Sequence, residues 1–96
     1  MTQIQIIAIR KPTLPDHHSA ITDYRWKDSS GQIKDTDRLT MVNWIQQNRA
    51  QHKAYVVDSR GDVAYCRVEH NIYGTYYLET QPDGIKSDNL LALPRF

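Results

Sequence analysis

Short apolar runs, each closed by turn residues, dominate this chain, and only one stretch of it has helical spacing. The runs are rich in β-branched and aromatic residues, which favours strands, while Gly, Pro, Asn, Asp and Ser punctuate the connections. Such runs occupy residues 3–9, 20–27, 54–57, 63–68 and 75–80, and a weaker return strand passes through Ile33. The chain is therefore expected to build a sheet of short strands.

The helical stretch begins near residue 36. Thr36 is the expected N-cap because its hydroxyl can accept from the first free backbone N–H groups, and Asp37 adds negative charge where the helix dipole favours it. The predicted apolar stripe consists of Met41, Val42 and Ile45, widened by Leu39 and Trp44. A helix that ends near residues 48–50 is expected to lay this stripe on the sheet.

These elements predict an α+β fold: an antiparallel sheet of four to five strands, with one helix packed on a face, in the order β-β-α-β-β-β. With 96 residues and 40% hydrophobic content, the chain is expected to form a single domain over residues 1–96. The C-terminal tail is expected to dock on the core, because a free terminus would expose Leu90, Leu91, Leu93 and Phe96.

Charge and cysteine content narrow the possible partners and compartment. Lys and Arg number 12 against 11 Asp and Glu, so the net charge of +1 makes a nucleic-acid partner an unfavoured prediction. No apolar stretch is long enough for a membrane helix or a secretory signal, and no membrane partner is expected. The single cysteine, Cys66, cannot form an internal disulfide. A soluble, cytoplasmic protein is the simplest interpretation.

The spacing of the histidines and acidic residues does not indicate a metal-binding site. The pair His17 and His18 is the first candidate, with His52, His70 and several aspartates as further ligands. No spacing typical of a metal site supports it, and exposed loop histidines are the preferred interpretation. The oxygen-rich residues 82–84 and 87–89 fit turn and cap chemistry, with Asp88 bonding the nearby backbone. No metal and no other cofactor is predicted.

The sequence also does not indicate a catalytic site. Cys66 lies in mid-strand on the same face as Ala64 and Val68, so we expect it to be buried and inert and not a nucleophile. The acidic residues sit mostly beside turns, which leaves no pair of carboxylates for acid–base work. No catalytic residue is predicted, and the chain is expected not to be an enzyme.

The most suggestive surface is a strand face that carries Tyr and Arg. If Cys66 faces the core, Tyr65 and Arg67 face the other way together with Glu69, and Tyr77 and Glu79 join them if Tyr76 and Leu78 are buried. The predicted binding residues are Arg25, Tyr65, Arg67 and Tyr77. Such residues suit a protein hot spot or base stacking, but cross-strand pairs that only stabilise an exposed sheet would look the same.

Several segments together resemble a known family. They are residues 41–45 (Met-Val-Asn-Trp-Ile), residues 54–57 (Ala-Tyr-Val-Val) and above all residues 77–84 leading into residues 87–96. The chain resembles the small bacterial domain-of-unknown-function family 3892, whose members are usually short stand-alone proteins. The resemblance covers most of the chain and implies no activity, because none is established for the family.

The leading functional hypothesis is a small non-enzymatic module that binds a protein partner through the Tyr and Arg face. The alternative is weak binding of single-stranded nucleic acid by the same residues, although Glu69 and Glu79 would repel phosphates. An enzyme whose site is completed by a second copy of the chain ranks third. Partner identity and oligomeric state are left open.

Overall fold

The computed structural model describes residues 2–14, 17–57, 60–80 and 90–96. The elements, in chain order, are β1 (Thr2–Arg10), the short 3-10 helix η1 (His18–Ala20), β2 (Asp23–Lys27), β3 (Ile33–Asp37), α1 (Arg38–Gln47), β4 (His52–Val57), β5 (Val63–His70) and β6 (Tyr76–Thr80). No helix among these residues is long and apolar enough to cross a membrane.

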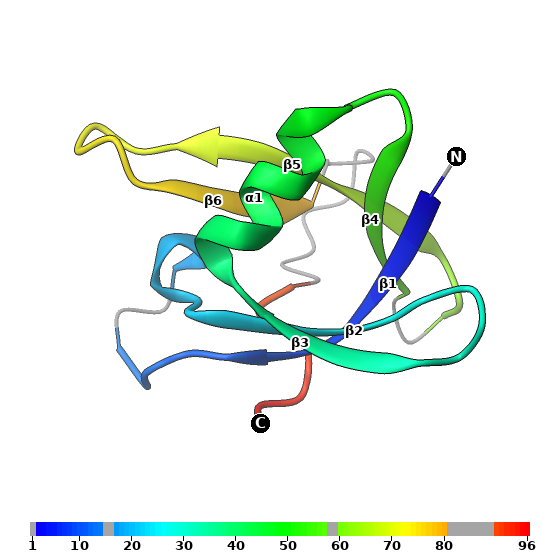
Figure 1. Ribbon diagram of the computed structural model, residues 1–96. Helices are drawn as coiled ribbons and strands as arrows, with labels where there is room; N and C mark the ends of the chain where they lie inside the picture. The colour runs from blue at the N-terminus through cyan, green and yellow to red at the C-terminus, as the bar shows by residue number, and fades with distance from the viewer. Residues whose placement is uncertain (1, 15–16, 58–59, 81–89) are drawn as a thin grey trace.

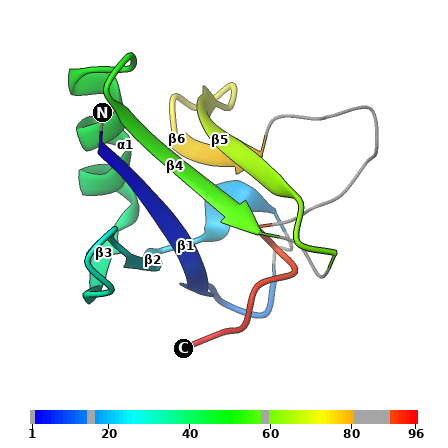
Figure 2. The same cartoon turned by 90° about the vertical axis from the view of Figure 1, so that its right-hand side faces the viewer.

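All the strands join one six-stranded sheet with the order β3-β2-β1-β4-β5-β6. Neighbours are antiparallel except β1 and β4, which run in the same direction (Figure 2). The α+β class is confirmed, whereas the predicted four to five strands, the purely antiparallel sheet and the order β-β-α-β-β-β are wrong. The observed order is β-β-β-α-β-β-β.

The parallel pair follows from the path of the chain. Two antiparallel turns leave β3 running in the direction of β1, and α1 then carries the chain back across the sheet (Figure 1). Strand β4 consequently starts at the same end as β1 and pairs with it from Thr2↔His52 to Gln5↔Tyr55. Strand β3 was only weakly indicated because its residues are almost all exposed, so its sequence lacks an apolar alternation.

The core lies between α1 and the face of the sheet that α1 covers. Its fully buried large side chains come from most parts of the chain and are Tyr24, Ile6, Ile9, Ile21, Met41, Leu78, Leu90, Val42 and Val56. The sheet is curved, since β6 at one edge contacts η1, which precedes β2. Burial raises the pKa of Tyr24 on β2, and the Leu78 backbone on β6, next to this hydroxyl, offsets only part of that rise.

The helix begins one residue later than predicted, with Asp37 as its N-cap. Asp37 Oδ2 accepts from the Thr40 backbone N–H at 3.1 Å, and Asp37 Oδ1 accepts from the Thr40 hydroxyl at 2.7 Å. Thr36 remains in β3, where it pairs with Tyr24, and its hydroxyl oxygen accepts from Trp26 Nε1 at 2.8 Å. Thr36 is therefore a strand residue and not the N-cap, because its pairing with β2 outweighs its local preference for the cap position.

The helix stripe is confirmed at Met41, Val42 and Ile45, all of which are buried. The prediction is wrong for Leu39, which is 58% exposed. At about 100° per residue, Leu39 lies roughly 110° from the centre of the buried arc. Trp44 lies at a similar angle on the other flank, but its longer side chain reaches the sheet and stacks on His52.

The docked C-terminal tail is confirmed. Leu90 is fully buried, and Leu91 and Leu93 pack against the core. The Ile9 N–H donates to the Pro94 carbonyl at 2.9 Å, and the Phe96 N–H donates to the Ile9 carbonyl at 3.1 Å. The tail thereby extends the ladder of β1 by a parallel bridge and ends beneath the sheet (Figure 2).

Two substitutions in α1 test which helix face supports the core. Met41→Ala should lower the free energy of unfolding by about 2–5 kcal/mol, because it leaves a cavity where the side chain is 2% exposed. Leu39→Ala should change it by about 0.5 kcal/mol or less. Urea denaturation followed by circular dichroism measures both, and a larger loss for Leu39→Ala would contradict the observed helix orientation.

The charge of the N-cap gives a pH-dependent prediction. Hydrogen bonds from the Thr40 hydroxyl and the Thr40 N–H lower the pKa of Asp37, so the charged cap stabilises the folded state above the unfolded-state pKa of about 3.9. This contribution is lost as the pH falls through the lower folded-state pKa. Unfolding of Asp37→Asn, which keeps an uncharged cap, should differ most from wild type above about pH 5 and converge with it below about pH 2. A difference that does not change with pH would contradict this role.

Candidate functional site

The register of the strands identifies the outer face, which we define as the face of the sheet opposite α1. Ala54 and Val56 of β4 are buried in the core, so Tyr55 between them points to the outer face. Residues directly opposite in an antiparallel ladder share a face. The ladders pair Tyr55 with Tyr65, Arg67 with Glu79 and Glu69 with Tyr77.

Tyr65 and Tyr55 form an aromatic pair across β4 and β5 on this face. Their ring centroids are 6.1 Å apart with an interplanar angle of 60°, and Tyr65 is 38% exposed. The predicted exposure of Tyr65 is confirmed. Tyr55 was missed as a candidate, although the apolar residues on either side of it already placed it opposite the core.

Arg67 also lies on the outer face, next to two carboxylates. Arg67 Nη2 donates to Glu79 Oε1 at 2.6 Å, and Arg67 Nε lies 3.2 Å from Glu69 Oε1. Hydrogen bonding to Glu79, supported by the charges of Glu79 and Glu69, raises the pKa of Arg67. The guanidinium charge is thus balanced within the face itself.

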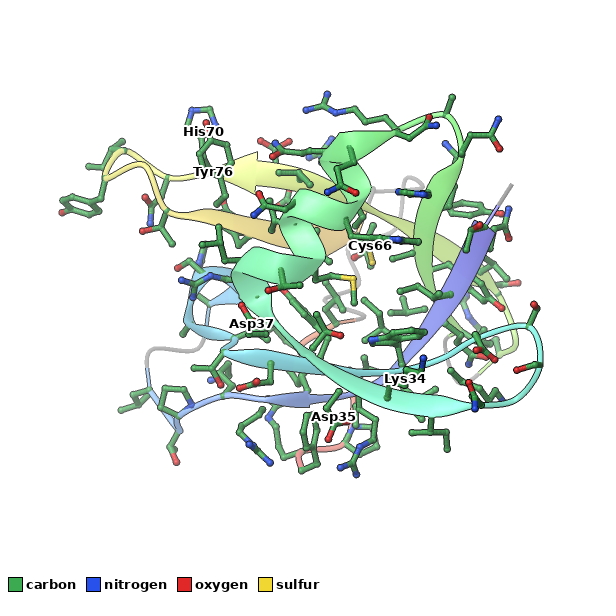
Figure 3. All side chains as sticks on the ribbon, viewed as in Figure 1. Lys34, Asp35, Asp37, Cys66, His70 and Tyr76 are labelled. Carbon is green, nitrogen blue, oxygen red and sulfur yellow. The ribbon has the colours of Figure 1, made fainter. Side chains whose placement is uncertain are left out.

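Tyr77 does not lie exposed beside Tyr65, so this expectation is wrong. It is 8% exposed, and the His17 ring packs edge-on against it with 5.3 Å between ring centroids. Burial, followed by the nearby charges of Glu79 and Glu69, raises the pKa of Tyr77. The condition set for this expectation is met by Leu78, which is buried, but not by Tyr76, which is 43% exposed and lies beside His70 at the start of β6 (Figure 3).

Arg25 belongs to a different part of the molecule. Its guanidinium donates to both carboxylate oxygens of Asp35, at 2.8 and 3.1 Å, and lies 4.2 Å from the centroid of the Phe96 ring. Strands β1 and β4 separate β2 from Tyr65 on β5. Of the four predicted binding residues, the structure therefore brings Tyr65, Arg67 and Tyr77 to one face, with Tyr77 covered, and only Arg25 lies apart.

A cleft opens where β4 and β5 separate. Their ladder covers only residues 55–57 and 63–65, and beyond it β5 pairs with β6 alone. A cavity of about 340 Å³ occupies the gap, lined by Ile45, Arg49, His52, Lys53, Cys66, Arg67 and Val68. The side chains of Arg49 and Lys53 make no hydrogen bond or ion pair with the part of the chain that the structure describes. Neither was a sequence candidate, because their proximity depends on where the strands part.

Cys66 and His52 line the same cleft, but the thiol is a poor nucleophile. Cys66 faces α1 (Figure 3), and burial raises the pKa of its thiol to about 12. The thiol therefore stays protonated at neutral pH. His52 Nδ1 donates to the Trp44 carbonyl at 2.6 Å, so this nitrogen carries the proton.

The paired histidines are tied to their own loop. His17 Nδ1 hydrogen-bonds with the Ser19 side chain at 2.9 Å, and the rings of His17 and His18 meet edge-on. Among the residues described, no group of three potential metal-ligating side chains is found. The predicted turn and cap at residues 82–84 and 87–89, including Asp88, lie outside those residues.

These features define a small α+β domain in which a curved mixed sheet is covered by one helix and leaves an aromatic, charged outer face. A family model described as protein of unknown function (DUF3892) matches residues 5–94, nearly the whole chain. The protein belongs to this family, as its sequence resemblance indicated. No curated protein and no solved structure matches the chain.

The two outer-face tyrosines should respond differently to truncation. Tyr77→Ala should lower the free energy of unfolding by about 3 kcal/mol or more, because its ring is packed under His17. Tyr65→Ala, which removes an exposed ring, should cost about 1 kcal/mol or less. Urea denaturation of both variants measures these changes. Equal losses in the free energy of unfolding would mean that His17 does not cover Tyr77 in solution.

Proposed function

We propose that this protein is a non-enzymatic interaction module that binds an acidic segment of a partner protein along the outer face of β4 and β5. The observation that carries the proposal is the cleft between these strands, where the side chains of Arg49 and Lys53 form no ion pair with another described residue. Lys53 lies two residues from Tyr55 along β4 and therefore on the same strand face as the aromatic pair Tyr55 and Tyr65. Charged groups of one sign in a concave surface attract the opposite charge and orient it.

The charge balance of this region favours carboxylates in the partner. Glu69 and Glu79 already neutralise Arg67, so the charges of Arg49 and Lys53 are those still available. No acidic side chain is among the described residues that line the cavity. An Asp or Glu of the partner would gain two cations there without displacing an internal ion pair.

The tyrosines supply the apolar part of such an interface. Tyr55 and Tyr65 lie directly opposite each other in the ladder, and their rings pack edge-on. Because each ring is already held by the other, binding of a partner costs little additional side-chain conformational entropy. Tyrosine is enriched at the centres of protein interfaces because it combines a large apolar ring with a hydroxyl group. An acidic segment with a neighbouring apolar residue would match this surface.

The non-enzymatic part of the proposal is supported by the protonated thiol of Cys66 and by the use of His52 Nδ1 in holding the Trp44 backbone. A cytoplasmic setting belongs to the same proposal, since a thiol in a small domain suits a reducing compartment. Single-stranded nucleic acid is the alternative ligand, because cations beside aromatic rings also suit it. Glu69 and Glu79 count against it.

A charge-reversal selection tests the proposal. Random twelve-residue peptides are displayed and selected on the wild-type protein, and the selected set should be enriched in Asp and Glu next to apolar residues. For a labelled selected peptide, fluorescence anisotropy should show about tenfold weaker binding to Lys53→Glu, equivalent to about 1.4 kcal/mol. Selection on Lys53→Glu should lose the acidic preference.

Lys34→Glu on β3 is the matched control and should leave peptide affinity unchanged, because it makes the same charge change three strands away from β4. Labelled oligothymidylate is titrated in parallel, over a range of salt concentrations. Selected peptides without an acidic excess would refute the proposal. Tighter binding of the oligonucleotide than of any selected peptide would favour the nucleic-acid alternative instead.

A further inference from the structure

A second cavity opens on the helix side of the sheet, away from the outer face. It has a volume of about 270 Å³ and lies between α1 and strands β1 to β3. Its lining is mostly apolar and consists of Thr2, Ile4, Trp26, Asp28, Thr36, Thr40, Met41 and Trp44. The volume corresponds to about nine waters at a liquid share of about 30 Å³ each, which suits a small organic molecule.

Both tryptophans of the chain line this cavity, and each is held by a partner. Trp26 Nε1 donates to the Thr36 hydroxyl oxygen at 2.8 Å, which uses the only hydrogen-bond donor of that indole. The Trp44 ring stacks flat on His52, with 4.3 Å between centroids and an interplanar angle of 2°. Both indoles are therefore positioned in advance, and Trp26 offers a ligand aromatic surface and no free N–H donor.

Among the described residues that line the cavity, Asp28 is the only one with an ionisable side chain. Its Oδ1 accepts from the Ser30 hydroxyl at 2.6 Å, from the Ser30 N–H at 2.9 Å and from the Gln32 N–H at 3.0 Å. These bonds, led by the one from the Ser30 hydroxyl, lower the pKa of Asp28, so the group is a carboxylate at neutral pH. All of them end on Oδ1, and no hydrogen bond to Oδ2 is found among the described residues.

A cation already lies near one of these indoles. Lys34 Nζ is 5.9 Å from the centroid of the Trp26 ring, within the range of a cation–π contact. Lys34 and Asp35 leave opposite faces of β3 (Figure 3), so Lys34 is on the side of the cavity. Since the Lys34 side chain is exposed and flexible, it can move aside for a ligand that fills the cavity better.

We propose that this cavity binds a small organic cation with a methylated ammonium group, its alkyl groups between Trp26 and Trp44 and its charge facing Asp28. Aromatic faces attract such cations because their charge is spread over apolar methyl groups. An anion would be repelled by Asp28, and a neutral apolar molecule would desolvate this carboxylate without compensation. The site is separate from the outer face, so the two proposals stand or fall independently.

Choline and its uncharged isostere 3,3-dimethylbutan-1-ol test the proposal directly. Each is titrated into the full-length protein, with tryptophan fluorescence and the indole NMR signals as readouts. Choline should bind about tenfold more tightly than the isostere and shift both indole signals. Asp28→Asn, which retains an oxygen acceptor for Ser30 and Gln32, should lose most of this preference. Lys34→Gln should tighten choline binding, because it removes a competing cation.

Asp35→Asn is the matched control, since it removes a carboxylate from the opposite face of β3 and should leave choline affinity unchanged. Circular dichroism confirms that each variant is folded. Equal affinities for choline and the isostere, or no binding of choline, would overturn the proposal. So would an unchanged preference in folded Asp28→Asn. If Asp28→Asn does not fold, the comparison of the two probes on wild type and Lys34→Gln decides the question.

Discussion

The apolar cluster buried between α1 and the sheet is the feature on which the rest of the structure depends, and α1 approaches β4 and β6 most closely. Ile4 and Ile6 of β1 and Met41 and Val42 of α1 are buried in one cluster. Each such side chain contributes about 1.5–3 kcal/mol when it is fully removed from water. Because β1 pairs with β2 on one side and with β4 and the tail on the other, this packing also aligns the remaining strands.

The cleft and the cover over Tyr77 share one structural origin. Strand β4 is held to β1, whereas the second half of β5 is held to β6, so the two halves of the sheet meet through only the short ladder of residues 55–57 and 63–65. The sheet can turn at this junction. The turn opens the gap beside Lys53 and brings β6 close to η1, where His17 meets Tyr77.

The stacked pair Trp44 and His52 connects the two cavities. Trp44 lines the cavity on the helix side, and His52 lines the cleft between β4 and β5. The two cavities differ in charge. In the part of the chain that the structure describes, Asp28 is the only ionisable side chain that lines the first, while Arg49 and Lys53 line the second. A domain of 96 residues thus presents two surfaces of opposite electrostatic character, separated by one pair of rings.

The sequence alone determined the elements whose signals are local. The spacing of Met41, Val42 and Ile45 identified the helix, the alternation around Cys66 identified which face of β5 carries Tyr65 and Arg67, and the leucines identified the docked tail. These predictions were correct because each depends on the period of one element and on the need to bury apolar surface.

Only the tertiary structure decided which strands became neighbours and what covered them. The alternation of apolar and polar residues along a strand predicts which face each residue occupies, but it does not predict which strand lies beside it. The parallel pairing of β1 with β4 and the separation of Arg25 from Tyr65 therefore could not be predicted from the sequence. The covering of Tyr77 and the clustering of Arg49 with Lys53 depend on sheet curvature, which arises from the packing of all the elements together.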